Sequence, residues 1–122
     1  MILMAQFNLF LDDLRTPNDV YNYMHLPMYI DDDWLCVHNT KEFIDAVNTH
    51  GIPDRISFDH DLGLLYDDGA KTARAFIDYC MANDLSLTSD IYIHTQNPVG
   101  RERIESLFKS YFKVLSLIKA FE

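Results

Sequence analysis

The sequence predicts an α/β domain, a three-layer sandwich in which a doubly wound parallel sheet of about five strands lies between helices. Short apolar segments with strand character alternate along the chain with segments whose apolar residues recur every three or four positions. Such alternation implies parallel strands that are joined by right-handed crossovers, with helices on both faces. The length of 122 residues and the apolar share of 48% predict a single domain, residues 1–122, that folds around its own core.

The first strand and the stretch that follows it come from the first quarter of the chain. Residues 6–11 alternate and then run apolar until the sequence becomes Asp12-Asp13, which is typical of a strand that stops at a polar edge. Residues 14–33 contain prolines and are expected to be irregular, with one short helix around residues 19–24.

A second strand and a well-marked helix follow. Residues 34–38 form a short apolar segment with strand character. Asn39, followed three positions later by Glu42, resembles a capping box, and the apolar residues after it keep helical spacing until Gly51. A helix is therefore expected over residues 40–50.

The second half of the chain repeats the alternation. Apolar spacing predicts a helix over residues 70–83, and Pro98 suits the first position of a further helix. Three more strands are expected, at residues 55–59, 90–94 and 113–118. This order of elements is flavodoxin-like, and in such sheets ligands bind outside the carboxyl ends of the strands.

The composition excludes several classes of protein. No apolar run approaches the roughly 20 residues that span a bilayer, and the N-terminus lacks the pattern of a signal peptide, so we expect a cytoplasmic protein with no membrane partner. Cys36 and Cys80 lie in apolar stretches without other ligands nearby. We interpret both as reduced core residues.

The charge balance bears on partners. Acidic residues number 19 against 10 Lys and Arg, and the net charge is −9. Proteins that grip duplex nucleic acid neutralise phosphates with Lys and Arg, so duplex binding is not expected. A small phosphorylated ligand is compatible with this charge, because a metal ion and one or two Arg reverse the local potential.

Polar sequence follows three of the expected strands. The first strand runs into Asp12-Asp13-Leu14-Arg15, the third into Asp59-His60-Asp61, and the fourth into His94-Thr95-Gln96-Asn97. The carboxyl ends of parallel strands lie side by side. We therefore expect these side chains to share one crevice, whereas Asp31–Asp33 and Asp67-Asp68 follow no strand and are interpreted as solvated loop acids.

Clustered carboxylates need compensation. Two like charges 4 Å apart repel by about 4 kcal/mol at an effective dielectric constant near 20. Protonation, ion pairing with Arg15 or Arg101, or a divalent cation would each relieve this repulsion. Oxygen ligands favour Mg²⁺ or Mn²⁺, and a histidine would also admit Fe²⁺ or Zn²⁺. The helix start at Asn97, with Arg101 one turn in, suits an anion.

Three segments carry a family resemblance. Residues 9–17 (LFLDDLRTP), 58–63 (FDHDLG) and 94–101 (HTQNPVGR) resemble the cyclic-phosphate-processing receiver-like domains, which are related to response-regulator receivers. The resemblance implies a receiver-type fold whose pocket handles phosphate esters. Receivers carry a Mg²⁺-binding acidic pair, a phosphoacceptor Asp, a Thr or Ser and a Lys at successive strand ends. Here Asp12-Asp13, Asp59 and Thr95 match, and Lys119 is the candidate for the last position.

The leading hypothesis is a metal-dependent phosphoesterase that acts on a cyclic nucleotide or on a cyclic-phosphate end of RNA. The expected roles are catalysis for His60, His94, Asp59 and Asp61, metal binding for Asp12, Asp13 and Asp59, and phosphate binding for Arg15, Thr95, Asn97 and Arg101. The alternative is a noncatalytic receiver-like module that binds a phosphorylated ligand or accepts a phosphoryl group on Asp59. A structural adaptor with a vestigial pocket ranks last.

Overall fold

The computed structural model describes residues 6–63 and 66–120, with side chains up to residue 114. The elements in chain order are β1 (Asn8–Leu11), α1 (Pro17–Met24), α2 (Met28–Asp31), β2 (Leu35–Val37), α3 (Thr40–His50), β3 (Arg55–Phe58), α4 (Gly69–Ala82), β4 (Asp90–Ile93) and α5 (Pro98–Ala120). None of the described helices is both long and apolar enough to cross a membrane.

The strands form one parallel sheet in the order β2-β1-β3-β4. The register pairs Leu11 with Val37 on one side and with Phe58 on the other, and Phe58 with Ile93. All four strands therefore end at the same level. The residues that come directly after β1, β3 and β4 are Asp12, Asp59 and His94, which lie at one end of the sheet.

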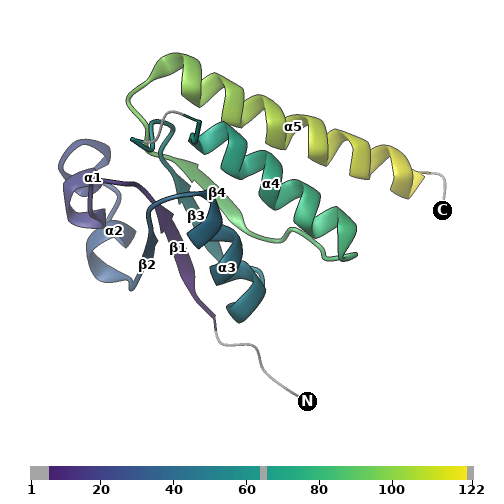
Figure 1. Ribbon diagram of the computed structural model, residues 1–122, viewed down its shortest axis with the longest axis horizontal. Coiled ribbons are helices and arrows are strands. Elements are labelled where there is room, and N and C mark those ends of the chain that lie inside the picture. The colour runs from purple at the N-terminus through teal and green to yellow at the C-terminus, as the bar shows by residue number, and fades with distance from the viewer. Residues whose placement is uncertain (1–5, 64–65, 121–122) are drawn as a thin grey trace.

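Helices cover both faces of the sheet, which confirms the three-layer prediction (Figure 1). The larger core packs α3, α4 and α5 against the alternate strand residues Leu9, Leu11, Ile56 and Phe58. The smaller core packs α1 and α2 against Phe10 on the opposite face. Period-two alternation in parallel strands produces both cores, because successive side chains point to opposite faces.

Local signals set the helix boundaries. The Thr16 side chain accepts a hydrogen bond from the backbone N–H of Asp19, and the Asp19 carboxylate accepts one from the backbone N–H of Thr16. This capping box starts α1 at Pro17, earlier than the sequence predicted. Asn39 caps α3 through the backbone N–H of Glu42, and the predicted bounds of this helix are confirmed. Asp68 caps α4 in the same manner through Lys71.

The predicted fifth strand is wrong. Residues 113–118 continue α5, and the described part of the sheet has four strands. The alternation in this segment favours a strand, but positions 104, 108, 111, 115 and 118 also keep helical spacing, with no Gly or Pro between them. Ile104, Phe108 and Tyr111 are buried in the larger core, so packing selects the helix. Lys119 consequently lies in a helix and ends no strand.

Two smaller interpretations are also wrong. Cys80 is buried as expected, but Cys36 is exposed, because β2 is an edge strand with little cover. Asp67 is not a solvated loop acid, since its carboxylate accepts bonds from the backbone N–H and hydroxyl of Thr40 at the start of α3. Asp68 is the cap of α4.

Candidate functional site

A crevice of about 420 Å³ opens at the carboxyl end of the sheet. Its lining residues follow β1, β3 and β4, and they are Asp12, Asp13, Leu14, Arg15, Asp59, Asp61, Thr95, Gln96 and Asn97. The structure therefore brings together seven of the predicted site residues, namely Asp12, Asp13, Arg15, Asp59, Asp61, Thr95 and Asn97. Four of these carry carboxylates and one carries a guanidinium group, so the lining is acidic.

Asp12 is held in place by its own loop. One carboxylate oxygen accepts from the backbone N–H groups of Leu14 (2.9 Å) and Arg15 (2.8 Å). The other lies 3.0 Å from Nε2 of His94. Burial alone would raise the pKa of Asp12, but the bonds from His94 and from the two backbone groups outweigh it and hold the pKa below its usual value. Asp12 is consequently ionised in a site where it is only 2% exposed.

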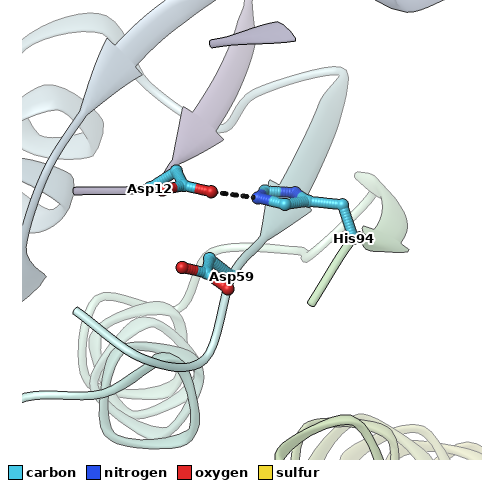
Figure 2. A group of neighbouring side chains, drawn as sticks. All are labelled: Asp12, Asp59 and His94. Atoms are coloured by element: carbon cyan, nitrogen blue, oxygen red, sulfur yellow. Dashed lines mark hydrogen bonds and ion pairs between the residues drawn. The ribbon is translucent and has the colours of Figure 1, made fainter. Parts of the chain in front are cut away.

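Asp59 lies beside the Asp12–His94 pair and has a different environment (Figure 2). It is 5% exposed. Burial raises its pKa, and the negative charge of Asp12 raises it further, while the His60 backbone, His94 and Arg15 only partly oppose this. The two neighbouring carboxylates therefore repel each other, and this repulsion raises the pKa of Asp59, whereas the pKa of Asp12 stays low.

His94 is completely buried and held from several sides. Besides Asp12, its ring contacts Ser57, whose Oγ lies 2.7 Å from Nδ1, and it stacks on Phe10 with the ring centroids 4.6 Å apart. The Ser57 hydroxyl lies 2.7 Å from the Tyr29 hydroxyl. A buried chain of hydrogen bonds thus runs from Asp12 through His94 and Ser57 to Tyr29, and the imidazole has a fixed orientation.

Asp12, Asp59 and His94 form a group that fits a divalent cation. One ligand atom from each lies within 4.8 Å of the other two, and all three residues are buried. Ligand atoms about 2.0–2.2 Å from a small cation are separated by distances of this order or slightly less. The two carboxylates suit Mg²⁺ or Mn²⁺, and the imidazole adds affinity for Mn²⁺ and later transition metals. A cation there would also remove the repulsion that raises the pKa of Asp59.

Arg15 provides the positive charge in the crevice lining. Its guanidinium group donates to Oε1 of Gln96 at 3.1 Å and lies 5.6 Å from the centre of the Tyr23 ring. The Tyr23 hydroxyl in turn donates to the backbone oxygen of His94 at 2.6 Å. Arg15 is therefore positioned over the wall of the crevice without an acidic partner among the described residues.

The start of α5 forms another wall. Asn97 Oδ1 accepts from the backbone N–H groups of Val99 (3.1 Å) and Gly100 (3.2 Å), and Asn97 Nδ2 lies 3.4 Å from Asp61. The side chain of Asn97 already satisfies these helix-end donors. They are available to an anion only if Asn97 moves, so the predicted anion site at this helix start is less open than the sequence suggests.

Three predicted site residues lie outside the crevice lining: His94, which is buried beside Asp12, and His60 and Arg101. His60 is 8% exposed and packs under Gly100, where a Cβ would lie 2.2 Å from its ring. Its Nδ1 lies 3.3 Å from Asp61, and its buried Nε2 has no hydrogen-bond partner. Arg101 donates to the backbone oxygen of Ile93 at 2.6 Å and lies 3.7 Å from Glu105, on the far side of β4.

Sequence reasoning missed the residues that support His94. Ser57 is a hydroxyl residue between the apolar Ile56 and Phe58 of β3, and that exception was the available signal. Tyr23 and Tyr29 come from the segment that was expected to be mostly irregular, and no local pattern connects them to a strand that follows 28 or more residues later.

Comparison with known proteins identifies a family and shows a similar fold among the solved structures. Residues 7–110 match the family model described as "Cyclic-phosphate processing Receiver domain". No curated protein matches the chain. A solved chain described as a yeast Spc42 trimeric coiled coil fused to another structure is similar, with a TM-score of 0.54 and 20% identity. The match covers 86% of this chain and 62% of that one, and at this identity it concerns the fold alone.

Proposed function

Because the chain belongs to the family of cyclic-phosphate-processing receiver domains, we propose that its crevice is the active site of a metal-dependent phosphoesterase that opens a cyclic phosphate. The observation that carries this proposal is the buried group of Asp12, Asp59 and His94. Two carboxylates whose repulsion raises the pKa of one of them form a costly arrangement that a bound cation relieves.

The carboxylates of Asp12 and Asp59 would hold the cation, with Asp13 also in the crevice lining, and His94 would become a ligand only by exchanging its Nε2 bond to Asp12 for the cation. When bound, a divalent cation lowers the pKa of water and stabilises charge on phosphoryl oxygens. His94 holds the Asp12 carboxylate at 3.0 Å. Asp13 is kept close by Gly63, where any Cβ would lie 2.5 Å from an Asp13 carboxylate oxygen.

The substrate phosphate would lie between Arg15 and the residues after β4. Arg15 contributes a guanidinium group, and Thr95, Gln96 and Asn97 contribute neutral polar groups to the same lining. Because Arg15 is free of carboxylate partners among the described residues, its charge is available to a phosphate. This wall would fix the orientation of the ring that is opened.

Opening the ring requires that water adds to phosphorus, that one P–O bond breaks, and that the leaving oxygen takes a proton. Asp61 lines the crevice, and its side chain is 72% exposed. His60 lies behind it at 3.3 Å, whereas His94 has both ring nitrogens engaged. We therefore assign the proton transfer to Asp61 assisted by His60.

The test is a turnover assay of the purified protein with Mg²⁺ or Mn²⁺ against 2′,3′-cyclic nucleotides, 3′,5′-cyclic nucleotides and cyclic dinucleotides. We expect product with one of these classes and its loss with EDTA or in Asp59→Asn. Lys41→Ala, which removes an exposed ion pair with Asp45 on α3, is the control and should keep full activity. Turnover that survives EDTA would reject the metal role.

The same purified protein can be used to distinguish the enzyme from the alternative function, a receiver-like switch. A receiver-like switch would accept a phosphoryl group from acetyl phosphate on Asp59 and hydrolyse none of the cyclic substrates. Stable labelling that depends on Asp59, without turnover of any cyclic phosphate, would favour the switch over the enzyme.

A further inference from the structure

A second concave surface lies between α4 and α5, which run side by side (Figure 1). This groove has a volume of about 570 Å³, larger than the crevice. Its charged lining residues are Lys71, Arg74 and Arg103, together with Asp68 and Glu102. The balance is three cations to two acids, in contrast to the one cation and four acids of the crevice.

The cations of this groove lack acidic partners. Elsewhere in the chain Lys41, Arg55 and Arg101 form ion pairs. No hydrogen bond or ion pair with any described residue engages the guanidinium groups of Arg74 and Arg103. In a chain with 19 acidic residues and 10 basic ones, two neighbouring Arg without a carboxylate are available for an external anion.

The groove and the crevice meet at one backbone bridge. Asp61 lines the crevice, Asp68 lines the groove, and these two residues pair in an antiparallel bridge. The Asp68 carboxylate caps α4, because it accepts a hydrogen bond of 2.7 Å from the backbone N–H of Lys71. Buried Nε2 of His60 lies between the two surfaces, 3.9 Å from Asp68. The crevice and the groove are therefore neighbouring surfaces that meet at the Asp61–Asp68 bridge.

An exposed aromatic side chain stands at the same junction. Tyr66 is 83% exposed. The Nζ of Lys71, a lining residue of the groove, donates a hydrogen bond of 3.1 Å to the backbone oxygen of Tyr66. Basic grooves with exposed aromatic side chains are the usual surface for single-stranded nucleic acid, because the cations follow the phosphates while the bases stack.

We propose that the groove between α4 and α5 binds the phosphodiester backbone of a single-stranded oligonucleotide whose cyclic-phosphate end lies in the crevice. This inference rests on the proposed function and narrows its substrate class. Arg74 and Arg103 contact successive phosphates, and Tyr66 stacks with a base near the junction. A cyclic mononucleotide fills the crevice alone and does not reach the groove.

The test compares binding of two ligands by the full chain. A fluorescein-labelled hexauridylate that ends in a 2′,3′-cyclic phosphate is titrated by fluorescence anisotropy, and 2′,3′-cyclic UMP is titrated as its competitor. In Arg74→Ala/Arg103→Ala, we expect the oligonucleotide to bind at least tenfold more weakly and cyclic UMP to bind as before. The slope of log affinity against log salt should fall by about 1.4, since each lost phosphate contact removes about 0.7.

The matched control is Lys41→Ala/Lys109→Ala, which removes the same charge away from the groove. It should keep oligonucleotide affinity within about twofold. The inference is overturned if the Arg variant binds the oligonucleotide like the unaltered protein, or if the control loses as much affinity. A failure of the proposed function has another signature: the groove-dependent binding persists, but neither ligand is hydrolysed at any metal concentration.

Discussion

At the scale of single residues, the site is governed by the unequal situation of two neighbouring carboxylates. Asp12 receives three hydrogen bonds that hold its pKa low, whereas burial and the charge of Asp12 raise the pKa of Asp59. Ionised Asp59 therefore destabilises the protein when no cation is bound. Because the pKa of Asp59 is higher in the folded protein than in the unfolded chain, the free energy of unfolding increases as pH falls through the pKa of folded Asp59.

Asp59→Asn should therefore stabilise the metal-free protein. The amide removes the repulsion with Asp12 at similar volume, so Tm in EDTA should rise by a few degrees at pH 7, and the difference from the unaltered protein should shrink in acid. Differential scanning fluorimetry measures both. Asp54→Asn, which changes an exposed acid at the opposite end of the sheet, is the control, and an equal rise there would contradict the repulsion argument.

Tyr29 carries a second prediction at this scale. Burial raises the pKa of its phenol to about 12, and the bond with Ser57 only partly offsets this. An unfolded phenol loses its proton near pH 10, so in this window the folded state binds more protons. The free energy of unfolding should therefore fall by about 3 kcal/mol between pH 10 and 12 because of this group alone.

The check is urea unfolding of the protein and of Tyr29→Phe across that window. The variant should show a shallower decline with pH, and it should lose about 1 kcal/mol at neutral pH from its missing bond to Ser57. Equal slopes for both proteins would show that Tyr29 is not the group that titrates.

At the scale of elements, Arg101 connects α5 to the open edge of β4. Its guanidinium group caps the outward carbonyl of Ile93, and this contact is remote from the crevice lining. Arg101→Met should lower the free energy of unfolding by about 1 kcal/mol and leave KM for a cyclic phosphate within about twofold. A tenfold rise in KM at unchanged stability would instead favour the phosphate-binding role that the sequence predicted.

The elements also show what the sequence could and could not predict. Helix α3 was predictable to the residue because Asn39 and Gly51 mark its ends. Residues 113–118 were not, because the same apolar residues satisfy a period of two and a helical period, and burial of Ile104 and Phe108 against distant residues decides between them.

The candidate site also has a part that the sequence could predict and a part that it could not. The polar ends of β1, β3 and β4 could be brought together from topology alone, since parallel strands share one end. The separation of His60 and Arg101 from the crevice could not, because it depends on side-chain direction. Arg101 turns toward the Ile93 carbonyl, and His60 fills the space that Gly100 leaves beside it.

At the scale of the whole molecule, cation binding should be coupled to global stability. A ligand that binds only the folded state at 100 times its Kd adds about 2.7 kcal/mol. For a domain of this size that corresponds to a Tm increase of about 10 °C. Titration with Mn²⁺ or Mg²⁺ after treatment with EDTA should show this rise, and Asp12→Asn should abolish it. An unchanged Tm with every divalent cation would contradict the metal site.

The stacking of His94 on Phe10 has a consequence for the kinetics of binding. With one ring face against Phe10 and both nitrogens engaged, the imidazole has no second rotamer to sample. The conformational entropy of this side chain, which fixes the Asp12 carboxylate, is therefore lost during folding and not when a cation arrives. Association should proceed at a rate that is limited by dehydration of the ion, with no slow rearrangement of the protein before it.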